Sequence, residues 1–136
     1  MKTILSLTLA LFTTSMAWAQ RTFEGIYSSQ ELSIKAHVSL YRDTIPVPGL
    51  EMDMCYGYLS GRINGTWVIL KVKELDDDHA LVRAASDRGA DAQDLLLKKD
   101  DEGNLLIKQV GDTYIKGIGG NKYVKLPKPF VLKKIK

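Results

Sequence analysis

The stretch ELSIKAHVSLY, residues 31–41, alternates apolar and polar side chains over its whole length. A period of two puts successive residues on opposite faces of a strand, so this pattern is typical of a β-strand with one buried face. The expected buried face consists of Leu32, Ile34, Ala36, Val38 and Leu40. The stretch therefore predicts a sheet rather than a helix.

The same alternation returns along the rest of the chain. Residues 66–72 and 78–87 repeat it clearly, with lysine and arginine on the expected solvent face. Shorter apolar runs follow at residues 95–97, 105–107, 114–118 and 123–126. A succession of short strands of this kind, without long helical periodicity, is typical of an all-β protein.

Turn-forming residues separate the predicted strands. Asn64-Gly65 is a strong signal for a tight hairpin, because both residues tolerate the positive φ angles of such turns. Further turns are expected at 76–78, 100–104 and 119–121, and a loop or sheet edge at the proline-rich residues 46–49. Residues 86–96 fit either a short helix or an irregular loop.

These elements predict an antiparallel meander of about eight or nine strands closed into a small barrel. Closure removes exposed sheet edges, and an eight-stranded barrel has room inside for side chains or one small ligand. A β-sandwich is the alternative architecture. The consecutive hairpin signals favour the barrel.

The ends of the chain differ from this body in composition. Residues 1–19 have a basic start, a short apolar run and the small residues Ala17 and Ala19, which predicts a signal peptide cleaved after Ala19. The apolar run is shorter than the about 20 residues that a spanning helix needs, so no membrane span is expected. A single β-barrel domain is then predicted for 20–126, and a basic tail for 127–136. The protein is expected to be secreted or periplasmic.

Composition is ordinary for one globular domain, with 45% hydrophobic and 26% charged residues. The charges are unevenly distributed along the chain. Residues 20–103 contain 10 basic and 15 acidic side chains, a net charge of −5, whereas residues 104–136 contain 8 basic and 1 acidic, a net charge of +7. Two surfaces of opposite sign could result, which would attract charged partners.

A resemblance follows from the glycine and aromatic residues. The chain opens with Gly25-Ile26-Tyr27 into a series of hairpins, with residues 57–61 (GYLSG) and Gly65-Thr66-Trp67 midway. In this it resembles small secreted bacterial calycin-like, or lipocalin-like, β-barrel proteins. The resemblance implies the barrel fold and covers the whole predicted mature chain.

Catalytic chemistry is weakly supported by the sequence. Cys55 could pair with His37 or His79, but a lone thiol in an apolar run more often fills a core. Asp87, Asp91 and Asp94 cluster in the ambiguous segment and are candidates for a hydrolase, although a solvated loop explains them as well. The protein is therefore expected not to be an enzyme.

Metal, cofactor and nucleic-acid sites are not predicted either. The acidic turns at 76–78 and 100–102 lack the ligand spacing of a calcium-binding loop, so no metal is assigned. Nucleic-acid binding is not expected, because an exported protein rarely meets that ligand. It would have drawn on Lys125, Lys128, Lys133, Lys134 and Lys136 together with Tyr123 and Phe130.

Aromatic and methionine side chains give the candidate ligand-binding site. Met54, Tyr56 and Tyr58 share one face of a predicted strand, after Met52, and Trp67 follows nearby. Such side chains suit a ligand cavity or an exposed binding surface, although they would equally form an ordinary barrel core. Apolar residues on both faces near Trp67 would need a cover, which residues 129–132 could supply.

The sequence thus predicts an exported, non-enzymatic and monomeric β-barrel binding protein. Its ligand would be a small apolar molecule, with Met54, Tyr56, Tyr58 and Trp67 at the site, or an exported protein. The alternative is a periplasmic inhibitor or immunity-type protein, in which the acidic turns at 76–78 and 100–102 would meet a basic enzyme. A hydrolase ranks below both.

Overall fold

A computed structural model describes residues 23–49, 54–88 and 91–136, and this part of the chain is entirely β and loop. The predicted signal peptide lies outside the described residues. Ten strands are present: β1 (Glu24–Ser29), β2 (Ile34–Ser39), β3 (Gly57–Gly61), β4 (Trp67–Leu75), β5 (His79–Ser86), β6 (Ala92–Lys99), β7 (Leu105–Val110), β8 (Gly117–Gly119), β9 (Lys122–Val124) and β10 (Phe130–Lys134).

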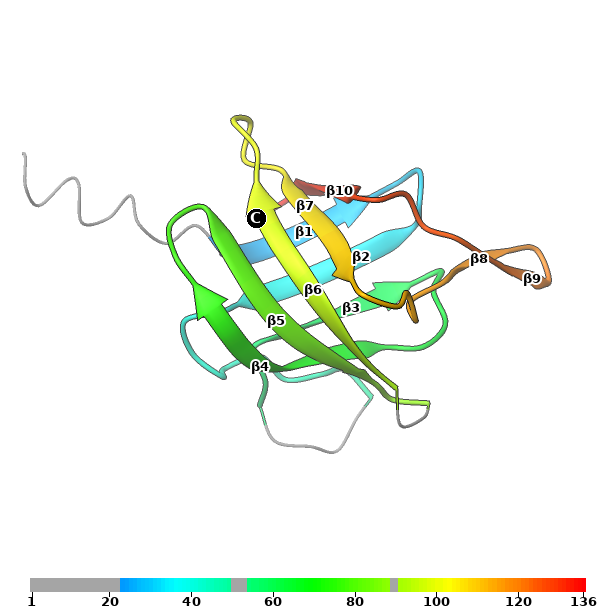
Figure 1. The fold of residues 1–136 in the computed structure, drawn as a ribbon, viewed down its shortest axis with the longest axis horizontal. Coiled ribbons are helices and arrows are strands. Elements are labelled where there is room, and N and C mark those ends of the chain that lie inside the picture. Colours follow the sequence, from blue (N-terminus) through cyan, green and yellow to red (C-terminus); the bar gives the residue numbers. More distant parts are fainter. Residues whose placement is uncertain (1–22, 50–53, 89–90) are drawn as a thin grey trace, which may run out of the picture.

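Eight of the strands close into an antiparallel barrel in the order β1-β10-β7-β6-β5-β4-β3-β2 (Figure 1). Strands β1 to β6 each pair with the next strand in sequence. β10 pairs with β7, which skips the separate β8–β9 hairpin, and with β1, which closes the barrel. The predicted all-β class and closed meander are confirmed, and the sandwich alternative is wrong. In the described part of residues 86–96 the helix alternative is also wrong, because β5 ends at Ser86 and β6 begins at Ala92.

Because the side chains of a strand alternate between its two faces, every second side chain points into the barrel. In β5, for example, Ala80, Val82 and Ala84 are buried, whereas Arg83 between them is exposed. The interior is filled by one continuous cluster whose largest wholly buried members are Trp67, Tyr27, Phe23 and Phe130. The inside of this barrel is therefore a packed core.

The last strand corrects the predicted domain boundary. Residues 127–136 were expected to form a basic tail, but Phe130–Lys134 form β10, which pairs with both β1 and β7. Phe130 and Leu132 point into the core, while the intervening Val131 is exposed. The lysines and prolines around this short strand concealed its alternation, and the barrel extends well beyond residue 126.

A second apolar cluster lies on the outer wall of the barrel, over β3 and β4. Tyr58 and Val68 are buried there beneath three side chains of the β2–β3 connection, Ile45, Val47 and Cys55. This connection supplies the outer cover for which residues 129–132 were a candidate. Apolar side chains can thus occupy both faces of the wall.

The up-and-down topology sorts the connections between the two ends of the barrel. The acidic turns, residues 76–78 and 100–104, follow β4 and β6 and therefore share one end, which we call the acidic end. The β7–β10 connection, residues 111–129, lies at the other end together with the β3–β4 loop. No helix in the described part of the chain is long and apolar enough to cross a membrane.

Candidate functional site: the β7–β10 connection

The β7–β10 connection leaves the barrel and forms the β8–β9 hairpin, which projects from the rest of the molecule (Figure 1). Residues 111–129 contain four lysines and one aspartate, Asp112. Every residue of β9 is exposed, including Tyr123 at 64% and Val124 at 45%. An exposed tyrosine beside an exposed valine on a projecting basic hairpin is the most prominent apolar feature of this surface.

Two segments join the β8–β9 hairpin to the barrel, and we call residues 111–116 the first leg and residues 125–129 the returning leg. Asn64 of the β3–β4 loop attaches the first leg to the barrel. Its Nδ2 donates to the Tyr114 carbonyl at 2.8 Å, and its Oδ1 accepts from the Lys116 amide at 2.9 Å. The same Oδ1 accepts from Trp67 Nε1 at 3.3 Å. One side chain therefore links the hairpin base to the largest residue of the core.

Two buried glutamines hold the same leg from the other side. Gln109 makes a reciprocal pair with Ile115, accepting from its amide at 2.9 Å and donating to its carbonyl at 3.0 Å. Gln93 accepts from the Tyr114 amide at 2.7 Å and donates to the Val110 carbonyl at 3.1 Å. Buried side-chain amides need hydrogen-bond partners, and the bonds that these two glutamines make to backbone groups fix the path of the first leg.

Apolar contacts complete the attachment. Ile115 is wholly buried in the main core, and Leu126 of the returning leg packs against the same core. The Ile118 amide also donates to the Arg62 carbonyl at 3.0 Å. The hairpin is thus projecting but anchored on both legs, which limits the conformational entropy that it would lose on binding.

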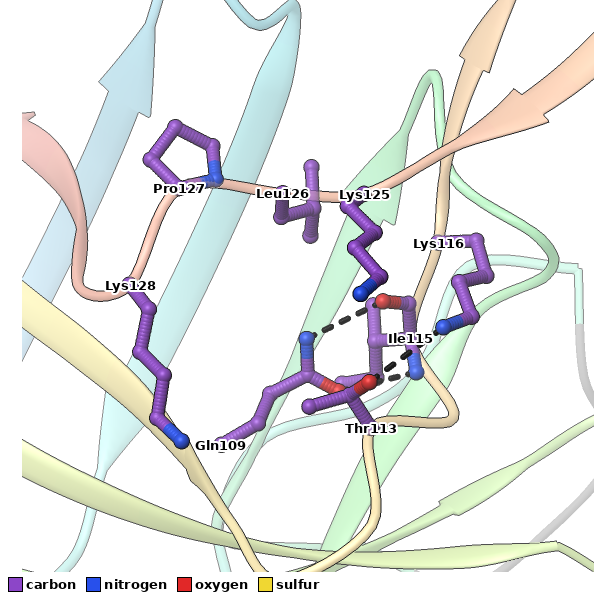
Figure 2. A pocket seen from close by; sticks show the side chains of 8 residues that line it. All are labelled: Gln109, Thr113, Ile115, Lys116, Lys125, Leu126, Pro127 and Lys128. Atoms are coloured by element: carbon purple, nitrogen blue, oxygen red, sulfur yellow. Dashed lines mark hydrogen bonds between the residues drawn. The ribbon is translucent and has the colours of Figure 1, made fainter.

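A cavity of about 210 Å³ opens between the two legs (Figure 2). Its walls come from the end of β7, the first leg and the returning leg. We call it the lysine pocket, and it is lined by Gln109, Thr113, Ile115, Lys116, Lys125, Leu126, Pro127 and Lys128. In Figure 2 the side chains of Lys116 and Lys125 point toward Thr113, and Lys128 lies on the other side of the pocket.

The predicted ligand-binding residues do not gather in one pocket. Met54 is 55% exposed, Tyr56 is partly buried against the main core, Tyr58 is buried in the outer cluster and Trp67 is buried inside the barrel. Met52 lies outside the described residues. Tyr56 and Tyr58 lie on opposite sides of the wall, one against the main core and the other in the outer cluster. Gly57 between them has a φ of +152°, and a side chain there would lie 2.4 Å from the His37 carbonyl oxygen.

The Cys55 thiol makes structural contacts. It donates toward the carbonyls of Ile45 and Gly57, each at 3.2 Å, in the buried outer cluster. Burial raises the pKa of Cys55, which disfavours the thiolate that nucleophilic chemistry requires. His37 stacks edge-on against Tyr58 with the ring centroids 6.0 Å apart, and burial lowers the pKa of His37.

Of the three aspartates considered for hydrolysis, two have partners on the surface. Asp94 accepts from Arg83 Nε and from Lys73 Nζ, both at 2.9 Å, and these bonds hold the pKa of Asp94 below its ordinary value. Asp87 accepts from the Thr66 amide at 2.8 Å. A general acid needs a raised pKa, so the environment of Asp94 favours a structural ion pair instead.

The acidic turns are also stabilised internally. Asp76 accepts from the amides of Asp78 and His79, and Asp100 accepts from those of Glu102 and Asn104, at 2.7–2.9 Å. These bonds lower the pKa of both aspartates. No group of three or more His, Cys, Asp or Glu side chains suited to a metal ion is found among the described residues.

The sequence pattern alone does not mark the β7–β10 connection as a site. Gln93 and Gln109 occupy inward positions of their strands. A polar side chain at an inward position indicates that a nearby group must form hydrogen bonds with it, and this was the available signal.

The fold and this site together define a small up-and-down β-barrel with an anchored basic hairpin. Comparison of the chain with protein-family models, curated proteins and solved structures finds no match.

Proposed function

We propose that the chain is an exported, non-enzymatic binding protein that docks onto a protein partner through the β8–β9 hairpin. The observation that carries this proposal is the exposure of Tyr123 and Val124 on a hairpin whose base is anchored by Asn64. Tyrosine is enriched in protein interfaces because it offers a large apolar ring with a polar end. Preorganisation of the base reduces the ordering cost of binding.

Charge indicates which kind of partner fits. The connection has four lysines against one aspartate, and Lys122 and Lys125 flank the exposed pair in sequence. An acidic binding surface would complement these lysines and accelerate association. The specific form that we favour is inhibition of an exported enzyme, in which the Gly119-Gly120 tip enters an acidic cleft.

This version replaces the earlier hypothesis that the acidic turns meet a basic enzyme. Those turns lie at the opposite end of the barrel, and Asp76 and Asp100 are already used in local hydrogen bonds. A small apolar ligand is less well supported, because Trp67, Tyr27 and Phe130 fill the interior. The eight-stranded up-and-down topology fits the proposed calycin-like relationship, although function depends on the site rather than on the fold.

Site-specific photo-crosslinking tests the proposal. A photoreactive residue replaces Tyr123 in one variant and the exposed Lys108, on the outer wall at β7, in a control variant. We expect a cross-linked protein of defined mass from position 123 and none from position 108, when both variants are irradiated in cells that produce the protein. High salt screens exposed charges, so it should lower the yield of the cross-linked product in cell extracts.

The competing outcomes are distinct. Equal products from both positions would indicate nonspecific contact, and absence of a product at 123 would indicate that the hairpin does not dock. Either result contradicts the proposal. The control is matched because both positions lie on exposed strand residues of the same molecule.

A further inference from the structure

We propose that the lysine pocket binds a phosphate group. This ligand site is separate from the exposed face of β9, because none of the residues that line the pocket belongs to the β8–β9 strands. The inference therefore goes beyond docking of the hairpin.

Three lysine side chains place hydrogen-bond donors around the cavity. Lys116, Lys125 and Lys128 reach it from two different legs of the connection (Figure 2). Lys116 Nζ also donates to Thr113 Oγ1 at 3.2 Å, which positions one ammonium group and leaves its other protons available. Ammonium groups are common phosphate ligands in proteins because they offer three donors on a compact charge.

The charges of these lysines are not balanced by ion pairs in the described part of the chain. Within the described residues, no carboxylate forms an ion pair with Lys125 or Lys128. No Asp or Glu lines the pocket. Three positive charges around one cavity repel each other, so a multiply charged anion between them would relieve this repulsion. A phosphate dianion matches that requirement better than a single carboxylate.

The walls of the lysine pocket are held in place, and the cavity between them is small. The reciprocal Gln109–Ile115 pair fixes one wall, and Pro127 restricts the backbone of the other. The cavity of about 210 Å³ is smaller than the roughly 300–1,000 Å³ typical of drug-sized ligands. A single phosphate group fits such a site, while the remainder of a larger ligand would extend into solvent.

Two sources of phosphate share this chemistry, namely a soluble phosphate compound and a phospholipid headgroup. Isothermal titration calorimetry would use inorganic phosphate and glycerol phosphate, each against chloride at equal ionic strength. Co-sedimentation would compare vesicles of phosphatidylglycerol with vesicles of phosphatidylcholine. Binding of the soluble compounds indicates the first source, and binding to phosphatidylglycerol vesicles alone indicates the second.

The variant that tests the pocket is Lys116→Gln/Lys125→Gln/Lys128→Gln. Its matched control is Lys71→Gln/Lys98→Gln/Lys108→Gln, which removes the same charge from exposed positions on the barrel strands. We expect at least tenfold weaker binding in the pocket variant and less than twofold change in the control. Thermal unfolding of both variants checks that each is folded.

The outcomes that would overturn the inference are clear. Equal weakening in the two variants would show a general charge effect, and no binding of any phosphate probe to the unsubstituted protein would show that the pocket is not such a site. The Tyr123→Ser variant separates this inference from the proposed function. It should lose the protein partner and retain phosphate binding.

Discussion

Asn64 illustrates how a single side chain can organise the site. Its amide group has three hydrogen-bond partners, on Tyr114, Lys116 and Trp67, so that the β3–β4 loop, the hairpin base and the core are joined at one residue. The first two partners are 50 and 52 residues away in sequence. Asn64-Gly65 indicated a turn, but local pattern carries no information about partners at such separations.

Replacement of Asn64 tests this role. Asn64→Ala removes three hydrogen bonds and leaves Trp67 Nε1 without its partner, which should lower the free energy of unfolding by about 1–3 kcal/mol. The Lys116 amide should also exchange faster with solvent. Urea unfolding and amide hydrogen exchange measure these effects. The control is Asn121→Ala at the exposed hairpin tip, and equal effects of the two substitutions would contradict the assigned role.

Lys99, the last residue of β6 before the acidic turn at 100–104, contacts the buried Tyr27 of β1, although these two strands are not neighbours in the barrel. Lys99 Nζ donates to the Tyr27 hydroxyl at 2.5 Å and lies 4.4 Å from the centre of the Tyr27 ring. Burial and, secondarily, Lys134 lower the pKa of Lys99 to about 8, although Asp100 acts in the opposite direction. Burial and Tyr41 raise the pKa of Tyr27 to about 12.

These shifts predict a stability maximum in alkaline solution. Between pH 8 and about 10 the unfolded chain holds a proton on Lys99 that the folded protein has released, so Lys99 makes the free energy of unfolding rise with pH. The rise should be steepest below about pH 9, because above it the raised pKa of the buried Cys55 thiol acts in the opposite direction. Above about pH 10 the unfolded chain loses the Tyr27 proton first, and stability should fall. Urea unfolding at several pH values measures this profile. In Lys99→Met the rise should disappear, and an unchanged profile would refute the assignment.

At the scale of elements, β10 decides whether the sheet is closed. Without it, β1 and β7 would have open edges and the core would lose Phe130 and Leu132. The sequence predicted β2 and β5 well because their alternation spans six or more residues. It predicted β6 only as a short apolar run at residues 95–97, because the start of this strand lies in the segment that also fitted a helix or a loop. It did not predict β10 as a strand, because two buried residues flanked by lysines resemble a tail.

Adjacent positions in β10 provide a matched test. Leu132→Asp buries a carboxylate in the core and should destabilise the barrel by about 3–5 kcal/mol, enough to abolish cooperative unfolding in a marginally stable domain. Val131→Asp places the same charge on a side chain that is 43% exposed, and its effect should stay below about 1 kcal/mol. Circular dichroism during urea unfolding distinguishes them. Equal tolerance would indicate that this segment is a loose tail after all.

Considered as a whole molecule, the barrel separates its charged connections by topology. The acidic turns at 76–78 and 100–104 lie at one end, whereas the basic connection of residues 111–129 lies at the other. The difference between a net charge of −5 in residues 20–103 and +7 in residues 104–136 indicated this separation only in part. Which end of the barrel carries which charge depends on the turn into which each strand leads. This can be worked out only when the order of the strands is known.

The candidate site was harder to predict than the fold for the same reason. Tyr56, Tyr58 and Trp67 are ordinary aromatic residues in a strand pattern, and the pattern does not reveal which face of a barrel wall is inside. The exposed Tyr123 belongs to a strand of only three residues without a buried face. Such a strand has no periodic signal, because packing does not constrain it.

The most direct test of the proposed docking is the identity of the partner peptide that a photoreactive residue at position 123 labels. Mass spectrometry of the digested cross-linked product gives that peptide and its place in the partner. We predict a segment from an acidic surface, rich in Asp and Glu, that is absent when position 108 carries the photoreactive residue. A labelled segment from a basic surface, or the same segments from both positions, would contradict docking through the β8–β9 hairpin.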